Sequence, residues 1–225
     1  MHMTRRPLLP GFVAVALAIG LLSSVSPTPV EAGLYSKDLY FRAGYERQID
    51  PYTCTAAGTA MMLNFVARRD LNLNQAYILD WEQARDSLDD RVQRGSDPLG
   101  WARAMTYFSA RAGKGAFTYR WETYTTEYIA LKHAARVIAE ENKPVGLLVS
   151  NGRHAMVMTG FEATRDPRRG DFTLVNVWIS DPNGSRHRLY AAKDSPLNKY
   201  LELDAVPVYY DQAWYGRYVI VAPPI

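Results

Sequence analysis

The stretch Gln48-Ile-Asp-Pro-Tyr-Thr-Cys-Thr-Ala-Ala-Gly-Thr-Ala-Met-Met-Leu-Asn-Phe-Val-Ala-Arg68 contains the only cysteine of the 225-residue chain, Cys54. After the cysteine, small and apolar residues recur at helical spacing, and Pro51 and Thr53 before it indicate a helix start with Thr53 as the cap. Cys54 is therefore expected at a helix N-terminus. There the unpaired backbone N–H groups and the positive end of the helix dipole favour a thiolate over a thiol. Gln48, six residues upstream, is placed to supply a further hydrogen-bond donor.

The composition is that of an ordinary globular protein, with 48% hydrophobic and 22% charged residues. We expect one domain over residues 33–225, and a monomer. The formal charge of +3 is spread along the chain, without a run of Lys and Arg interleaved with aromatic residues, so no nucleic-acid partner is expected. One cysteine and scattered histidines lack metal-ligand spacing, and we expect no metal and no other cofactor.

The first 32 residues are typical of an export signal. Two arginines at positions 5 and 6 precede an apolar stretch, and the segment ends in Val30-Glu-Ala32 with small residues at the cleavage positions. The apolar stretch covers 11 residues, 12–22, which is short of the roughly 20 needed to cross a bilayer. We therefore expect cleavage after Ala32, no stable membrane anchor and a secreted or extracytoplasmic protein, through either the twin-arginine or the Sec route.

The rest of the chain predicts an α+β domain, with an N-terminal helical half packed on a C-terminal antiparallel sheet. Two helices are expected after the cysteine helix: one over 72–93 with Tyr77 and Trp81 on its apolar face, and one that Asp97 caps and Gly113 closes. A further helix is expected over 125–141. The predicted strands are 117–121, 144–149, 155–161, 172–179 and 215–221. Residues 33–47 predict a short first strand or an arm, and 185–205 an irregular polar insertion.

Two further residues complete a chemical constellation with the cysteine. His154 stands at the start of one predicted strand, and Asp181 ends the next, directly before a Pro-Asn-Gly turn. If these strands pair as an antiparallel hairpin, the start of one lies beside the end of the other, within reach of an imidazole–carboxylate hydrogen bond. This arrangement predicts a Cys-His-Asp triad, in which a thiolate attacks a carbonyl carbon, the imidazole moves the proton and the carboxylate orients the imidazole.

Four pieces of the sequence, in this order, resemble the papain-superfamily cysteine peptidases, and most closely the bacteriocin-leader (double-glycine) peptidases and their exported relatives. The pieces are Gln48-x5-Cys-Thr-Ala-Ala, Pro144-Val-Gly-Leu-Leu-Val, His154-Ala-Met-Val-Met-Thr-Gly-Phe and Val177-Trp-Ile-Ser-Asp-Pro-Asn-Gly. The resemblance implies a papain-like fold and hydrolysis of a peptide or protein substrate. It also implies the roles of four residues: Gln48 in the oxyanion hole, Cys54 as nucleophile, His154 as base and Asp181 as the orienting carboxylate.

Other interpretations of the same residues stay open. Thr55 follows the cysteine where such peptidases commonly carry glycine, and we expect its side chain to crowd the approach to the thiol. His133 and His187 lack the strand context of His154. The main rivals to a peptidase are a catalytically inactive peptidase-like binding domain with a buried structural thiol, and an acyl-transferring enzyme of transpeptidase or transglutaminase type that uses the same triad.

Overall fold

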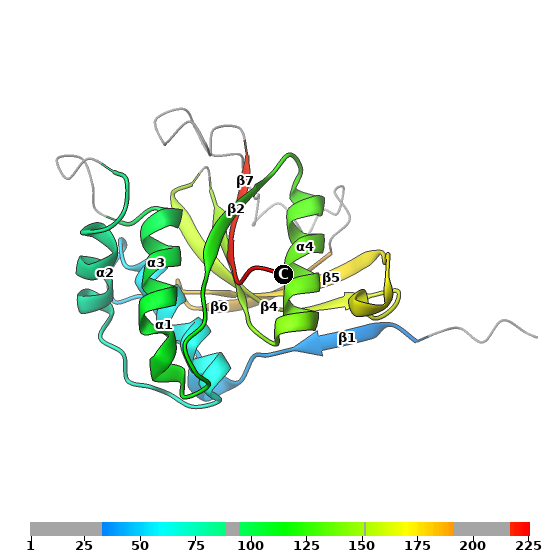
Figure 1. Ribbon diagram of the computed structural model, residues 1–225, viewed down its shortest axis with the longest axis horizontal. Helices are drawn as coiled ribbons and strands as arrows, with labels where there is room; N and C mark the ends of the chain where they lie inside the picture. Colours follow the sequence, from blue (N-terminus) through cyan, green and yellow to red (C-terminus); the bar gives the residue numbers. More distant parts are fainter. Residues whose placement is uncertain (1–32, 89–94, 151, 191–216) are drawn as a thin grey trace, which may run out of the picture. The chain divides into compact units, whose positions relative to one another are not determined.

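The computed structural model describes residues 33–88, 95–150, 152–190 and 217–225 (Figure 1). The predicted export signal and the second part of the predicted insertion, 191–205, lie outside these residues. The described residues belong to one compact unit that combines helices with an antiparallel sheet, which confirms the predicted α+β class.

Four α-helices are described. They are α1 (Cys54–Ala67), α2 (Gln75–Gln83), α3 (Pro98–Phe108) and α4 (Glu127–Glu141). The caps of α3 and α4 follow the sequence signals, because the Asp97 side chain accepts a hydrogen bond from the Gly100 N–H and α4 ends at Asn142 in the left-handed conformation. Short 3₁₀ helices cover Arg42–Gly44, Ser109–Ala112 and Pro167–Arg169.

Among the described residues seven strands form the sheet, and all pairs between them are antiparallel. The strands are β1 (Tyr35–Asp38), β2 (Arg120–Tyr124), β3 (Val145–Val149), β4 (His154–Ala163), β5 (Leu174–Asp181), β6 (Ser185–Tyr190) and β7 (Tyr218–Ala222). Their order is β2-β7-β3-β4-β5-β6. One edge of the long strand β4 is shared, since β3 pairs with its first half and β1 with its second half. Where β1 pairs with β4, a Cβ on Gly160 would lie 2.5 Å from the Lys37 carbonyl oxygen, so only glycine fits at this position.

Helices cover both faces of this sheet (Figure 1). Met156 and Met158 of β4 pack in one core with α4, whereas Ala155 and Val157 pack in a second core with α1 and α3. This alternation is the two-residue period expected of a strand that is buried on both faces. Helices α1 and α3 of the predicted N-terminal helical half thus pack on one face of the sheet, and α4 covers the opposite face.

The indole of Trp101 on α3 sets the distance between α1 and the sheet. It is fully buried, and two glycines on different elements make room for it. A Cβ on Gly58 of α1 would lie 2.8 Å from the indole Cζ2, and a Cβ on Gly146 of β3 would lie 2.6 Å from the same atom. Atoms this close must shift, so the ring is held between two backbones that carry no side chain.

Helix α2 differs from its prediction in length and in its buried face. It ends at Gln83 rather than near residue 93, and Gln75, Ile78 and Glu82 are its buried side chains. Tyr77 is half exposed, and the Trp81 ring stacks on Tyr107 of α3 with ring centroids 4.6 Å apart. Tyr77 and Trp81, which the prediction placed on the apolar face of the helix, therefore do not form its buried face; Trp81 instead contacts α3.

One predicted strand and the predicted insertion also differ in part from the structure. Strand β2 begins at Arg120, three residues after the predicted start, and residues 185–190 form strand β6 rather than an irregular insertion. Strand β6 pairs along β5 from Asp181 to Asn176 as the edge of the sheet. Its sequence, Ser-Arg-His-Arg-Leu-Tyr, carries charge where a central strand would be apolar, and charged residues are typical of edge strands.

The Trp101 contact predicts that Gly146→Ala destabilises the protein. The added methyl group overlaps the indole, and we expect the free energy of unfolding to fall by about 1–3 kcal/mol, as in other overpacked cores. Urea denaturation followed by tryptophan fluorescence measures this change. Gly33→Ala is the matched control, because a Cβ there meets no atom within 4 Å. Equal stability of the two variants would contradict the role given to the ring.

Candidate active site

Cys54 is the first residue of α1. It is a free cysteine that is 9% exposed. The first N–H groups of a helix have no acceptor within the helix, and the positive end of the helix dipole lies at the same place. Thr53 occupies the cap position, but its side chain does not cap the helix as predicted. Its hydroxyl instead accepts hydrogen bonds from the N–H groups of Ile49 and Asp50, which fastens the preceding loop.

Strands β4 and β5 bring His154 and Asp181 together. They pair as the predicted antiparallel hairpin, with Val157 opposite Ser180 near their shared end. The His154 Nε2 and Asp181 Oδ1 atoms are 2.8 Å apart, and each side chain is less than 15% exposed. The predicted imidazole–carboxylate hydrogen bond is therefore present between residues that are 27 positions apart in the chain.

The Cys54 side chain lies close enough to the His154 imidazole to raise its pKa. Since Nε2 is taken by Asp181, Nδ1 is the nitrogen left for the sulfur. Burial lowers the pKa of His154. The hydrogen-bonding and charge effects of Asp181 and Cys54 raise it by more than burial lowers it, and the resulting pKa is about 9. At neutral pH the imidazole is thus held in its protonated form between a carboxylate and a sulfur atom.

The turn after β5 fixes the Asp181 carboxylate. Its Oδ1 accepts a second hydrogen bond, of 2.8 Å, from the Asn183 N–H. The Asp181 carbonyl accepts one of 2.6 Å from the Tyr45 hydroxyl. The turn that supports Asp181 is therefore also tied to the segment that precedes Gln48.

Gln48 lies in the same cleft as His154. Its N–H donates to the Pro182 carbonyl at 2.9 Å, and its Nε2 donates to the Asp50 carbonyl at 2.8 Å. The amide nitrogen carries two hydrogens, so one of them is left for a further acceptor. Within the part of the chain that the structure describes, the buried Oε1 has no hydrogen-bond partner.

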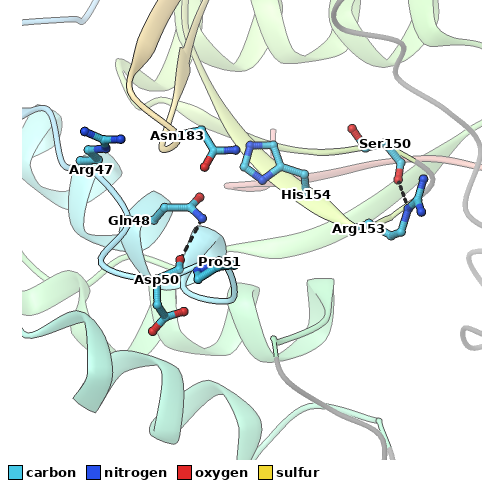
Figure 2. A pocket seen from close by; sticks show the side chains of 8 residues that line it. All are labelled: Arg47, Gln48, Asp50, Pro51, Ser150, Arg153, His154 and Asn183. Atoms are coloured by element: carbon cyan, nitrogen blue, oxygen red, sulfur yellow. Dashed lines mark hydrogen bonds between the residues drawn. The ribbon is translucent and has the colours of Figure 1, made fainter.

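The cleft has a volume of about 460 Å³. Gln48 and Asn183 extend towards His154 from one side, and Arg153 lies on the other (Figure 2). The cleft is lined by Arg47, Gln48, Asp50, Pro51, Ser150, Arg153, His154 and Asn183.

Gln75 was missed by the sequence analysis, although it holds the chain on both sides of Gln48. Its side chain is 6% exposed. Its Nε2 donates to the Arg47 carbonyl at 2.8 Å, and its Oε1 accepts from the Ile49 N–H at 3.2 Å. A buried amide that bonds both neighbours of a residue fixes its backbone position.

Glu82 was also missed, and it fastens the first turns of α1. The Thr55 and Thr59 hydroxyls donate hydrogen bonds of 2.6 and 3.0 Å to its carboxyl group, which is fully buried. Thr55 therefore points into the core towards α2, and the expectation that it crowds the thiol was wrong. Burial raises the pKa of Glu82 to about 8 in spite of the two threonine hydrogen bonds, and the neighbouring carboxylates of Asp86 and Asp97 add to the rise.

A sequence signal for these two residues existed. Gln75, Ile78 and Glu82 follow the three- and four-residue spacing of one helix face. Polar residues at such positions are usually expected to be exposed. The aromatic residues Tyr77 and Trp81 therefore indicated a different face of the helix as the buried one.

The competing histidines lie elsewhere. His133 is on α4, with its Nε2 3.2 Å from the Glu122 carboxylate of β2, and burial lowers its pKa. His187 is on β6, opposite Ile179 of β5. In the described ranges no group of three His, Cys, Asp or Glu side chains could hold a metal ion, and none of the helices found there is both long and apolar enough to span a membrane.

Comparison with known protein families finds no matching family model, and no curated protein matches the sequence.

The buried Glu82 predicts a pH-dependent stability. Its pKa is about 8 in the folded protein and 4.5 without burial, so between these values the folded state keeps a proton that the unfolded state has lost. The free energy of unfolding should therefore fall as pH rises from 4.5 to 8, by a few kcal/mol in total. Glu82→Gln, which is neutral throughout and can still bond to the threonines, should remove most of the slope between pH 5 and 6.5. Above pH 6.5 the raised pKa of His154 adds a slope of the same sign, which remains in the variant. Urea denaturation between pH 5 and 8.5 measures these slopes.

Glu140→Gln on α4 is the control, because Glu140 is exposed. The same pH slope in the wild type and in Glu82→Gln would show that Glu82 is ionised in the folded protein.

Proposed function

We propose that this protein is an exported cysteine peptidase of the papain-like class, which hydrolyses peptide bonds through a Cys54-His154-Asp181 triad without a cofactor. The observation that carries the proposal is the 2.8 Å hydrogen bond between the His154 imidazole and the Asp181 carboxylate, beside a free cysteine that begins helix α1 and raises the pKa of that imidazole. A nucleophile at a helix N-terminus, packed against an antiparallel sheet that carries the base, supports the papain-like comparison. Residues 1–32 supply the export signal on the sequence evidence given above.

In the first half of the reaction the Cys54 thiolate attacks the carbonyl carbon of the scissile peptide bond. A C–S bond forms, and the carbonyl electron pair moves onto the oxygen. The Cys54 N–H and the second hydrogen of Gln48 Nε2 are the donors available to this oxyanion. As the oxyanion collapses, the C–N bond breaks and His154 gives its proton to the leaving amine. The product of this step is a thioester on Cys54.

In the second half, water hydrolyses the thioester. The neutral His154 takes a proton from water, the hydroxide adds to the thioester carbon, and the C–S bond breaks to restore the thiolate. Asp181 stabilises the imidazolium that forms and holds its ring orientation, while the Asn183 N–H keeps the carboxylate in place. Each proton taken in one half is returned in the other, so the cycle consumes only water and the peptide.

The triad predicts that Cys54→Ser and His154→Ala each lower turnover of a mixed peptide substrate by at least about 10³-fold, while the fold remains. Mass spectrometry of the products measures turnover, and circular dichroism checks the fold. His133→Ala is the matched control and should keep activity. Turnover close to the wild-type rate in either triad variant would refute the mechanism.

The same assay separates the rival functions. An inactive binding domain would leave every peptide intact in the wild type. An acyl-transferring enzyme would join an added amine to the acyl fragment in preference to water.

The raised pKa of His154 predicts an alkaline limit of activity. His154 must be protonated to release the leaving amine, so kcat/KM should fall above a pH of about 9. Asp181→Asn removes the carboxylate charge that raises this pKa, so the limit should move to lower pH and the maximal rate should fall about tenfold or more without vanishing. Asp171→Asn, at an exposed carboxylate that pairs with Lys132, is the control. An unchanged pH profile in Asp181→Asn would mean that this residue only shapes its turn.

A further inference from the structure

The cleft beside His154 lies on the side of the thiol where the leaving part of a substrate must bind. Its lining includes His154, Gln48 and Asn183 but not Cys54. The imidazole delivers its proton to the leaving amine, so that amine and the residues attached to it lie next to the imidazole. The side chains that line this cleft therefore contact the part of the substrate on the C-terminal side of the scissile bond.

The lining of this cleft is polar and carries two guanidinium groups. Pro51 is the single apolar residue among its eight lining residues. Arg47 and Arg153 occupy opposite sides of His154 (Figure 2). The Arg47 guanidinium lies over the turn after Asp181, where a Cβ on Gly184 would be 3.7 Å from its Nε. The Arg153 Nε donates to the Ser150 carbonyl at 3.3 Å.

Neither guanidinium has a carboxylate partner among the residues that the structure describes, where every ion pair within 4.0 Å involves other side chains. The one carboxylate in the lining outside the triad belongs to Asp50. Its Oδ1 accepts a hydrogen bond from the Tyr52 N–H, and its side chain points away from His154 (Figure 2). The cleft thus offers two planar hydrogen-bond donors and an excess of positive charge, which is the chemistry that binds a carboxylate.

We propose that Arg47 and Arg153 are specificity residues that select a substrate with a carboxylate in its leaving part. The carboxylate belongs either to an Asp or Glu side chain just after the scissile bond or to the free C-terminus of a short leaving peptide. This inference rests on the proposed peptidase function. It names two residues and a substrate class that the triad alone does not give.

The first test uses two reagents that alkylate the same sulfur. Iodoacetate carries a carboxylate, whereas iodoacetamide is neutral and of nearly the same size. The ratio of their second-order rate constants on the folded wild type reports the attraction of the cleft for a carboxylate. Arg47→Gln and Arg153→Gln should each lower this ratio about two- to fivefold, Arg153→Lys should lower it less, and 0.5 M salt should reduce the wild-type ratio. The positive charge of His154 is common to all these proteins and cancels in the comparison.

Arg69→Gln is the matched control. Arg69 is exposed just beyond the far end of α1, roughly 20 Å from Cys54 at the helical rise per residue. Its removal should leave the ratio unchanged.

The second test distinguishes the two sources of the carboxylate. A peptide mixture is cleaved once with free C-termini and once after C-terminal amidation, and the cut sites are identified by mass spectrometry. Enrichment of Asp and Glu just after the cut in both mixtures indicates side-chain recognition. Cuts close to the C-terminus that vanish on amidation indicate recognition of the terminal carboxylate. Either preference should fall at least about fivefold in the Arg47→Gln, Arg153→Gln double variant.

The outcomes separate this inference from the proposed function. Peptides cleaved with no preference for a carboxylate, together with an alkylation ratio that the double variant leaves unchanged, would overturn the inference and leave the peptidase proposal standing. A thiol that neither reagent modifies in the folded protein, with no peptide cleaved, would remove the proposed function and this inference with it.

Discussion

The indole of Trp101, held between the backbones of α1 and β3, makes the contact on which the geometry of the candidate site depends. Cys54 is carried by α1 and His154 by the strand next to β3, so their separation is set by how closely the helix approaches the sheet. Gly58 and Gly146 permit that approach because a side chain at either position would displace the ring. A packing constraint in the core thus fixes a distance that the proposed chemistry requires.

The sheet supplies the second half of the geometry through its register. Antiparallel pairing of β4 with β5 brings His154 to Asp181, and the turn after β5 bonds to the segment around Gln48 through the Pro182 carbonyl. Three segments distant in sequence therefore meet at one rim of the sheet. Their polar groups are largely satisfied by one another, which lets a charged imidazole remain there with little access to water.

Much of this site could be predicted from the sequence, because its signals are local. A helix start marks Cys54, and the ends of two adjacent strands mark His154 and Asp181. Gln75 and Glu82 could not be found in this way, since polar side chains are buried only where distant backbone or hydroxyl groups meet them, and hydropathy does not report such partners. Strand β6 was missed because its sequence is mostly polar and lacks the pattern of a strand. Its backbone hydrogen bonds with β5, which hydropathy does not report, hold it in the sheet.

Helix α2 supports the site through two buried side chains that lie on the same helix face. Gln75 bonds the backbone around Gln48, and Glu82 bonds the first turns of the helix that begins with Cys54. Cys54 and Gln48 are thereby fastened to the same helix, whereas His154 and Asp181 belong to the sheet. When the helical layer and the sheet move apart, the sulfur and Gln48 travel together and the gap opens between sulfur and imidazole. In the proposed mechanism, loosening of the fold would then interrupt proton transfer before it disturbs the oxyanion hole.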